Sequence, residues 1–410
     1  MSEAGEHVVV VGAGHGGGSV VAFLRQFGWK GPITLIGDEP IPPYHRPPLS
    51  KAWLKGEADS TSLALRPPIF YADRAIALRL SCRVAAVDRA TQRVTLDTGE
   101  ALAYDRLILA LGSRPRKLAL PGSDLPGILE LRSAADADRL KAALGPGRRL
   151  AIIGGGYIGL EVAASARALG AEAIVIEREE RVLARVAGAD LSAFFESYHR
   201  RQGVVFDLAA QVAGFDGDAG GVTGVRLAGG RVIPCDAVLV GIGGVANDEL
   251  ARAAGLDCGN GIVVDAAARS SDPQIYAIGD CTNRPLPLYQ RHGRLESVPS
   301  ALEQAKQAAA DLCGRAPPAP EVPWFWSDQY DLKLQIAGLP FDAVSTVRRG
   351  DPESGGFAVF HLDADARVQS VEAINAAAEF MAGKSLIASR KPVDRDRLAD
   401  RGVSIKDVAA

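Results

Sequence analysis

Two segments of the chain share one pattern of apolar and polar positions. Residues 7–39 and 149–179 each hold a run of apolar, largely β-branched residues, a glycine-rich turn, an alanine-rich helical stretch and a second apolar run that ends in acid. We interpret each segment as a βαβ unit, because strands without polar positions suit a parallel sheet covered on both faces. The pattern therefore predicts an α/β fold with two Rossmann-like, doubly wound domains.

The rest of the pattern indicates how these domains are divided. Further buried strands end in glycine, and a proline-rich stretch at residues 314–324 precedes a region that alternates like an antiparallel sheet. We therefore expect three domains, the first of which is split by insertion of the second. They are residues 1–115 with 246–318, residues 116–245, and a C-terminal α+β domain of residues 319–410.

Composition narrows the class of protein. The 410 residues are 47% hydrophobic and 23% charged, with a net charge of -3, which is the balance of a globular protein and gives no reason to expect nucleic acid or an anionic membrane as a partner. The N-terminus is acidic where a signal peptide needs bases, and no apolar run reaches the roughly 18 residues that span a bilayer. We expect a soluble, cytoplasmic protein.

The cysteines argue against a thiol relay or a metal site. The chain has five, and none forms a C-x-x-C pair or a zinc or iron-sulfur spacing. An odd, scattered set in a chain without a secretory signal is most simply a set of reduced thiols, so we expect no metal. The five are Cys82, Cys235, Cys258, Cys281 and Cys313.

The first glycine turn has the spacing of a dinucleotide site. Gly12, Gly14 and Gly17 fit G-x-G-x-x-G between a strand and a helix, where the helix N-terminus offers backbone N–H groups to a pyrophosphate. Asp38 and Glu39 end the next strand, where a carboxylate can accept the ribose hydroxyls. The alternative, a structural turn that uses glycine only for close packing, explains fewer of these features.

The second turn repeats the spacing with Gly154, Gly156 and Gly159, and Glu177 ends its second strand. A carboxylate there repels a 2'-phosphate and favours NADH over NADPH, although Arg178 and Arg181 leave this open. A single cofactor needs only one such turn. A tightly held flavin in the first turn and a visiting nicotinamide in the second is the economical pairing, because hydride then passes between two stacked rings.

Several longer motifs add a resemblance that covers nearly the whole chain. They are VVVGAGHGG, IGDEPIPPYHRPPLSK, LILALGSRPR, IIGGGYIGLEVA, VGIGGVAND, IYAIGDC, RLESVPSALEQA and PWFWSDQY. With these the chain resembles the FAD-dependent, NADH-using ferredoxin reductases of glutathione-reductase-like fold, of the putidaredoxin reductase and biphenyl dioxygenase reductase type. The resemblance implies an oxidoreductase of the ferredoxin–NAD(+) reductase class, which takes hydride from NADH onto FAD and passes single electrons to a [2Fe-2S] ferredoxin. That ferredoxin feeds a cytochrome P450 or a Rieske-type oxygenase.

The resemblance also assigns residues to the two cofactors. The 1–115 and 246–318 domain is then the FAD domain, and 116–245 the NADH domain. The implied FAD contacts are Gly12, Gly14, Gly16, Gly17, Asp38, Arg46, Lys51, Val84, Arg132, Asp280 and Val298. The implied NADH contacts are Gly154, Gly156, Gly159, Glu177, Arg185 and Gly243.

Some residues invite two interpretations. Lys51 is either a solvated lysine or, by resemblance, a neighbour of flavin N5. Trp324 and Trp326 are either packing residues or, for Trp326 above all, aromatic neighbours of the flavin near the ferredoxin dock. Arg291 and Arg294 are either ordinary solvated charges or basic groups that steer an acidic ferredoxin. His15 and His45 are more simply structural.

Glu161 lies two residues beyond the last turn glycine and has two interpretations of its own. It complements the positive end of the helix as an acid of the first turn, or it faces Lys51 across the flavin and, with Lys51 and Trp326, serves the reaction.

We expect a monomer or weak dimer.

Three rivals share the architecture. An NADH oxidase or peroxidase needs a reactive cysteine after the second strand, and residues 38–51 contain none. A rubredoxin reductase stays open, because fold and flavin do not fix the acceptor. An apoptosis-inducing-factor-like protein acts partly by binding DNA, and a net charge of -3 argues against that role.

Overall fold

The computed structural model describes residues 5–409, which form two compact units. The first comprises residues 5–45, 60–114 and 245–323, and the second comprises 46–59, 115–244 and 324–409. Acidic Glu3, part of the N-terminal segment discussed above, lies outside the described residues. The second unit contains the segment 46–59 and most of the predicted NADH and C-terminal domains, whereas residue 245 and residues 319–323 belong to the first unit. The division into three domains stays a prediction.

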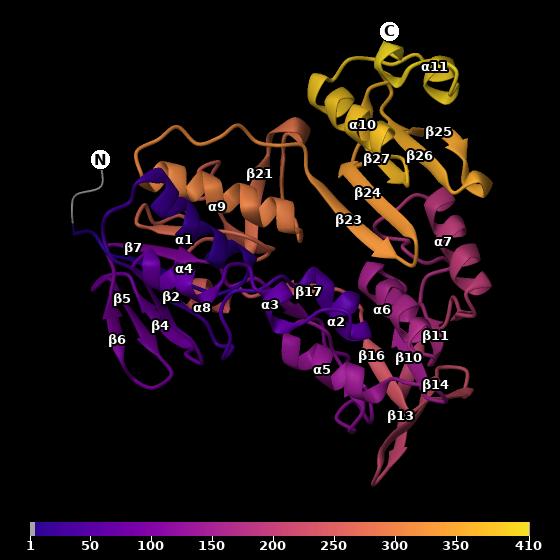
Figure 1. Ribbon diagram of the computed structural model, residues 1–410, viewed down its shortest axis with the longest axis horizontal. Helices are drawn as coiled ribbons and strands as arrows, with labels where there is room; N and C mark the ends of the chain where they lie inside the picture. Colours follow the sequence, from indigo (N-terminus) through magenta and orange to yellow (C-terminus); the bar gives the residue numbers. More distant parts are fainter. Residues whose placement is uncertain (1–4, 410) are drawn as a thin grey trace. The chain divides into compact units, whose positions relative to one another are not determined.

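The first unit is built on a five-stranded parallel sheet in the order β20-β7-β1-β2-β3. Its strands are β1 (Val8–Val11), β2 (Ile33–Ile36), β3 (Ile76–Arg79), β7 (Arg106–Leu109) and β20 (Ile275–Ala277). Helices α1 (His15–Phe27) and α9 (Val298–Leu312) lie side by side on it (Figure 1). The four valines of β1 are almost fully buried, which explains their unbroken apolar run.

Smaller elements complete the first unit. Strands β4 (Val84–Asp88), β5 (Arg93–Leu96) and β6 (Ala101–Ala103) form an antiparallel sheet. A four-stranded sheet joins β18 (Cys258–Gly259), β19 (Gly261–Val263), β21 (Thr282–Leu286) and β22 (Arg291–Gly293). The remaining helices are α3 (Ser60–Leu63), α4 (Pro68–Asp73), α8 (Glu249–Ala253) and η2 (Pro287–Tyr289).

The second unit contains a parallel sheet of the same plan, in the order β12-β11-β10-β16-β9. Its strands are β9 (Ile128–Leu129), β10 (Arg149–Ile153), β11 (Glu172–Ile176), β12 (Val205–Asp207) and β16 (Ala237–Val240). Associated helices are η1 (Pro47–Ser50), α2 (Ala52–Lys55), α5 (Ala134–Ala143), α6 (Tyr157–Ala168) and α7 (Ala189–Arg201). An antiparallel sheet follows, with β13 (Val212–Asp218), β14 (Gly221–Leu227) and β15 (Val232–Pro234). The short strands β8 (Ser113–Pro115) and β17 (Gly244–Ala246) lie where the chain passes between the units.

The C-terminal part of the second unit is an antiparallel sheet, called here the C-terminal sheet, in the order β23-β24-β27-β26-β25. Its strands are β23 (Trp324–Gln329), β24 (Leu332–Gly338), β25 (Ser345–Asp351), β26 (Gly356–Leu362) and β27 (Val368–Ile374). Helix α10 (Ala377–Ser389) packs on β27 and β24 (Figure 1). The chain continues through η3 (Pro352–Ser354), α11 (Arg395–Ala399) and η4 (Ile405–Asp407).

The predicted fold class is confirmed. Two parallel, helix-covered sheets of like strand order account for the two repeated segments, and the alternating C-terminal region forms an antiparallel sheet with a helix on it. Within residues 5–409, no helix has both the length and the apolar character needed to cross a membrane.

Candidate functional site

The first glycine turn, residues 12–17, leaves open space at its middle glycine. Gly12 has φ 108°, and a Cβ there would lie 2.2 Å from the carbonyl oxygen of Ala110. A Cβ on Gly17 would lie 1.9 Å from the oxygen of Gly12, so these two glycines let backbone meet backbone. A Cβ on Gly14 meets nothing within 4 Å. Gly16 is buried and faces the side chain of Ile278.

The second turn, residues 154–159, repeats this geometry. Gly154 has φ 106° and its Cβ would lie 2.4 Å from the oxygen of Gly241, whereas a Cβ on Gly159 would lie 2.2 Å from the oxygen of Gly154. A Cβ on Gly156 again meets nothing within 4 Å. The two turns therefore present the same backbone and the same open side.

Each open glycine is the N-cap of a long helix. Gly14 caps α1 and Gly156 caps α6, both in an extended conformation and without a side chain that caps the helix. The first N–H groups of a helix have no partner inside the helix, and the helix dipole adds positive potential there. Two turns of this shape fit two pyrophosphate groups.

Glu177 closes the second turn by accepting two backbone hydrogen bonds. Its Oε2 accepts from the N–H of Gly155 at 2.6 Å, and its Oε1 accepts from the N–H of Glu179 at 2.9 Å. The neighbouring cations are engaged: Arg181 donates to the carbonyl oxygens of loop residues and Arg178 pairs with Glu179 at 2.8 Å. Asp38 lies two residues beyond the end of β2 and is exposed.

Glu161 is the centre of a buried polar cluster in the second unit. Its Oε2 accepts from Ser50 Oγ at 2.5 Å and lies 2.6 Å from Lys51 Nζ, and its Oε1 accepts from Ser327 Oγ at 2.6 Å. The side chain of Glu161 is 7% exposed and that of Lys51 is 19% exposed. One carboxylate thus joins helix α6, the segment at η1 and strand β23.

This geometry corrects two expectations about Glu161. Helix α6 begins at Tyr157 and has no acid in its first turn, so Glu161 is too deep in the helix to serve as a helix-end charge. A separation of 2.6 Å between Lys51 Nζ and Glu161 Oε2 also leaves no room for a flavin between the two residues. Lys51 and Glu161 form a direct ion pair.

The cluster continues into the interior through β23. Gln329 Nε2 donates to Ser327 Oγ at 3.1 Å, and Gln329 Oε1 lies 2.7 Å from Nε2 of His199 on α7. His199 is fully buried, and desolvation lowers its pKa to about 4. The imidazole is therefore neutral at neutral pH, and it can donate to Gln329 without bringing a charge into the core.

The loop of residues 183–188, called here the Arg185 loop, lies against the second turn. Leu183 N–H donates to the oxygen of Gly155 at 2.9 Å, and the hydroxyl of Tyr157 donates to the oxygen of Val186 at 3.2 Å. Arg185 is exposed, and a Cβ built on Gly243 (φ 102°) would lie 3.6 Å from its guanidinium. Arg185 and Gly243, predicted together, are therefore neighbours.

The remaining predicted cofactor residues divide between the units. In the second, Arg46 donates to the oxygen of Arg132 at 2.6 Å. In the first, Asp280 accepts from Ser113 Oγ at 3.1 Å, Val84 opens β4, and Val298 is the first residue of α9.

The residues predicted near the ferredoxin docking site divide between the units. The two tryptophans, Trp324 and Trp326, belong to the second unit, and Arg291 and Arg294 belong to the first. Trp324 packs on Phe380 and Trp326, with ring centroids 5.8 and 5.7 Å apart, which gives Trp324 a packing role. In the first unit, Arg291 is exposed, whereas Arg294 is bound to Glu296 and to Asn260.

His15 and His45, expected to be structural, are in contact. Nε2 of His15 lies 3.2 Å from Nδ1 of His45 in the first unit. The five cysteines are free, and burial raises the pKa of Cys281 to about 12, so this thiol stays protonated. Between residues 5 and 409, no group of three or more His, Cys, Asp or Glu side chains is arranged to hold a metal ion.

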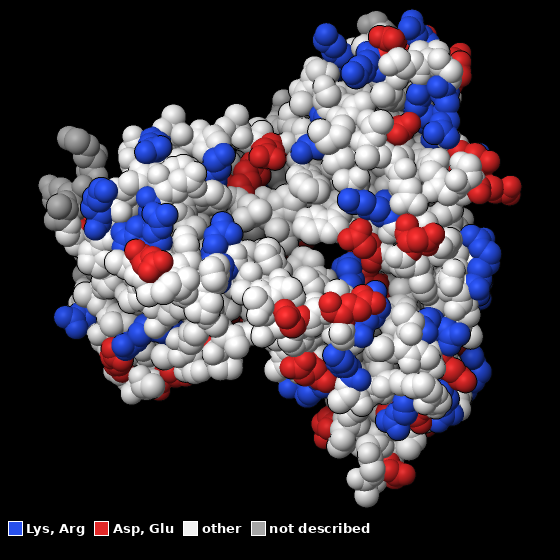
Figure 2. Space-filling view, viewed as in Figure 1, with Lys and Arg blue, Asp and Glu red and all other residues white. Residues whose placement is uncertain are grey.

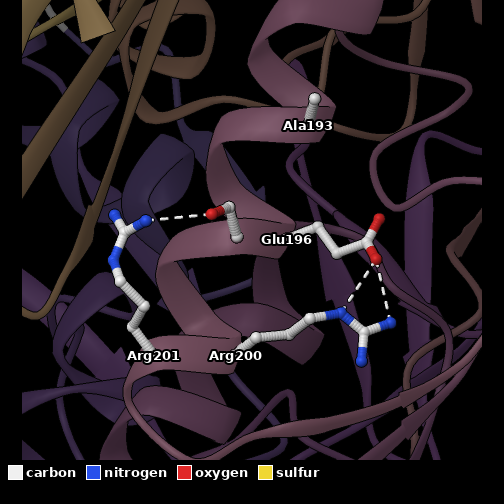
Figure 3. Close-up of a pocket in the computed structure, with 5 residues that line it drawn as sticks. Ala193, Glu196, Arg200 and Arg201 are labelled. Carbon is white, nitrogen blue, oxygen red and sulfur yellow. Dashed lines mark hydrogen bonds and ion pairs between the residues drawn. The ribbon is translucent and has the colours of Figure 1, made fainter. Parts of the chain in front are cut away.

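A shallow hollow on the surface of α7 has charged side chains but none that is available to bind a ligand. It is lined by one face of that helix, where Arg200 pairs with Glu196 and Arg201 donates to Ser197 Oγ, each at 2.9 Å (Figure 3). Both cations are already engaged by neighbours one turn away on the same helix. We therefore assign no ligand to it.

Sequence reasoning missed four members of the Glu161 cluster: Ser50, Ser327, Gln329 and His199. A signal was present in WFWSDQ, because a strand that places Ser327 and Gln329 on one side puts polar atoms on a buried face. Their partners lie far away in the sequence, however, and only the fold brings them together.

Two open glycine turns on two parallel sheets define a protein that binds two dinucleotides. The family model described as pyridine nucleotide-disulphide oxidoreductase matches residues 6–305, and the model described as reductase C-terminal matches residues 324–409. The chain belongs to this oxidoreductase family.

Individual relatives place it among the ferredoxin reductases of that family. A probable ferredoxin reductase of Castellaniella defragrans is 53% identical over 407 residues, which cover 99% of each chain. Putidaredoxin reductase of Pseudomonas putida is 43% identical over 99% of this chain and 97% of its own. The crystal structure of the covalent putidaredoxin reductase-putidaredoxin complex matches with a TM-score of 0.96 and 43% identity, over 99% of this chain and 98% of that one.

Proposed function

We propose that the chain is a ferredoxin–NAD(+) reductase, an FAD enzyme that takes electrons from NADH and passes them singly to a [2Fe-2S] ferredoxin. The observation that supports this most strongly is the pair of glycine turns with the same open geometry, in a chain related to ferredoxin reductases over 99% of its length. Bound FAD supplies the step between a two-electron donor and a one-electron acceptor.

The residues of the two turns supply binding and orientation. The first turn and Asp38 hold the FAD pyrophosphate and ribose, and the second turn, Arg185 and Gly243 hold those of NADH. The Lys51 and Glu161 pair fixes charge close to the reacting rings, and Ser50 and Ser327 keep Glu161 in place. Arg46, Val84, Arg132, Asp280 and Val298 complete the FAD contacts.

The contacts of Glu177 favour NADH over NADPH. Its carboxylate is fixed by two backbone N–H groups, and Arg181, the nearby cation, is already bound to loop carbonyl oxygens. A 2'-phosphate would meet a fixed negative charge, next to Arg181 and Arg178, which are already engaged by loop carbonyl oxygens and by Glu179. We expect the kcat/KM for NADPH to be at least about tenfold lower than that for NADH.

The partner is a ferredoxin, and we propose that Arg291 and Arg294 attract it and that Trp326 lies close to the docked protein. An acidic partner gains mainly in association rate from such charges. The face shown in Figure 2 intersperses acidic and basic side chains, which suits a locally steered partner better than DNA.

We propose a monomer or weak dimer in the cytoplasm, with a cytochrome P450 or Rieske-type oxygenase as the final acceptor.

Anaerobic titration tests the first half of this function. NADH should bleach the flavin absorbance at near-stoichiometric addition, and no bleaching would contradict the proposal. Cytochrome c reduction with a panel of ferredoxins and rubredoxins then tests the acceptor. A rate that depends on a [2Fe-2S] ferredoxin is expected, whereas equal rates with rubredoxin would favour a rubredoxin reductase.

A further inference from the structure

The Arg185 loop is held from two sides, and only one of them belongs to the predicted NADH domain. On that side, Leu183 is bonded to Gly155 and the hydroxyl of Tyr157 to the oxygen of Val186. The other end of the loop is Gly188, the N-cap of α7. Its N–H donates to a carboxylate from the C-terminal sheet, at Oε1 of Glu372, over 2.8 Å.

Glu372 belongs to a buried pair. It lies on β27 and is 3% exposed, and His361 on the neighbouring strand β26 is 7% exposed. Oε2 of Glu372 lies 3.2 Å from Nε2 of His361. Among the described residues neither of these two atoms makes a hydrogen bond, and the contact between them is a close approach of carboxylate and imidazole. A buried carboxylate costs stability unless it is paired and hydrogen-bonded, and the N–H of Gly188 supplies one such hydrogen bond.

The pair packs directly on the end of the loop. A Cβ built on Gly188 would lie 3.0 Å from Cε1 of His361 and 3.1 Å from Oε2 of Glu372. Gly188 has φ -66°, so its backbone conformation does not require glycine. The absence of a side chain here instead lets the loop reach the Glu372 carboxylate.

The charge of Glu372 also acts on Tyr157. Burial, followed by the charge of Glu372, raises the pKa of Tyr157 well above its usual value. The ring also packs edge-on against Phe325 of β23, with centroids 4.8 Å apart. Tyr157 therefore keeps its proton and can donate to Val186, while Gly188 at the end of the loop donates directly to Glu372.

We propose that Glu372, supported by His361, is a positioning residue that holds the Arg185 loop in the conformation that binds NADH. The C-terminal sheet would then set the affinity for the nucleotide without touching it. This inference rests on the proposed function, because it requires that Arg185 and the second turn bind NADH.

The test compares Glu372→Gln with the wild type as FAD-loaded protein. The amide still accepts from Gly188 but lacks the negative charge that faces His361, so the Kd for NAD(+) and the KM for NADH should rise about five- to tenfold. The rate of flavin reduction at saturating NADH and the ratio of FAD to protein should stay within about twofold of the wild type. Glu353→Gln, on an exposed turn of the same sheet, is the matched control and should change neither constant.

A second variant covers the case in which Glu372→Gln does not fold. Gly188→Ala places a methyl group against the pair and should raise the same two constants while FAD stays bound. An unchanged Kd in the folded variants, or a loss of saturating rate with an unchanged KM, would overturn the inference. If the wild type itself is not reduced by NADH, the proposed function fails instead, and the two failures are thereby distinguished.

Discussion

The two glycine turns have nearly the same backbone and very different surroundings. Gly12 and Gly154 differ by only 2° in φ, at 108° and 106°, and Gly14 and Gly156 both open onto free space. The position of α6 that holds Glu161 corresponds in α1 to Ser19, a buried hydroxyl. The repeated backbone supplies the binding site for a dinucleotide, and the two copies differ in the side chain that follows it, Glu161 in one and Ser19 in the other.

The difference between the copies follows from their contacts. Helix α6 meets the segment at η1 and strand β23, and Glu161 accepts hydrogen bonds from a serine on each. Helix α1 packs on α9 over an apolar surface that includes Ala305, Ala308 and Ala309. Hydroxyl donors surround the buried carboxylate of Glu161 in α6, which lowers the cost of burying its charge.

The largest expected effect comes from adding a methyl group to each turn. Gly12→Ala and Gly154→Ala put a Cβ within 2.2 and 2.4 Å of a carbonyl oxygen, at a positive φ that costs about 1–3 kcal/mol for a non-glycine residue. We expect Gly12→Ala to lose FAD, to below about a tenth of the wild-type flavin content. Gly154→Ala should stay yellow and bind NADH more than about tenfold more weakly.

Flavin absorbance per mole of protein and a titration with NAD(+) measure the two effects. Gly99→Ala, at a positive φ in an exposed turn with nothing near its Cβ, controls for backbone strain alone. If both turn variants lost FAD equally, the two copies would not serve separate cofactors.

The second expected effect concerns the side chain that differs between the copies. Glu161→Gln removes the partner of Lys51 and turns one carboxylate oxygen into a donor, so flavin reduction by NADH should slow by about ten- to a hundredfold. FAD should stay bound. Stopped-flow bleaching at saturating NADH measures the rate.

Ser19→Ala is the matched control at the equivalent position of α1, and its rate should stay within about twofold of the wild type. An unchanged rate in Glu161→Gln would reduce Glu161 to a structural role. A similar slowing in both variants would show that the two helices contribute in the same way, contrary to the comparison.

The sequence was sufficient to predict the repeated part of the molecule. Strand, turn and helix at residues 7–39 and 149–179 are local patterns, and the spacing of Gly12, Gly14 and Gly17 reflects close backbone approaches that only glycine allows. Parallel strands buried on both faces leave no polar alternation, which made the fold class clear.

The Glu161 cluster was beyond sequence reasoning for a physical reason. Ser50, Glu161 and Ser327 are separated by more than a hundred residues in each step, and no local pattern records a contact between them. The direct contact between Lys51 and Glu161 was missed because the expectation placed them in different domains, whereas residues 46–59 belong to the compact unit that contains Glu161.

The third expected effect is a pH dependence of the free energy of unfolding, which arises at His199 on α7. The pKa of His199 is lowered to about 4 in the folded protein, so below about pH 6.5 the unfolded chain binds a proton that the folded chain does not. Stability is then full above pH 6.5 and falls by about 1.4 kcal/mol per pH unit as the pH drops toward 4. By pH 5 the loss is about 2 kcal/mol.

His199→Gln removes this titration, so its Tm should fall less than that of the wild type between pH 7 and pH 5. His292→Gln, at an exposed histidine, is the control and should follow the wild type. Parallel curves for all three proteins would show that burial of His199 does not govern the acid sensitivity.

The smallest expected effect separates the two buried serines of the C-terminal sheet. Ser327→Ala leaves Oε1 of Glu161 and the amide of Gln329 without their shared partner, which should cost about 1–3 kcal/mol of stability and slow flavin reduction by about two- to fivefold. Ser370 is equally buried on β27, but its hydroxyl has no hydrogen-bond partner among the described residues, so Ser370→Ala should be neutral or slightly stabilising. Thermal unfolding and stopped-flow reduction measure both variants. Equal losses of stability in the two variants would mean that the cost arises from packing. A loss confined to Ser327→Ala would show that the hydrogen bond from strand β23 supports Glu161 of α6, a support that Ser19 of α1 does not need.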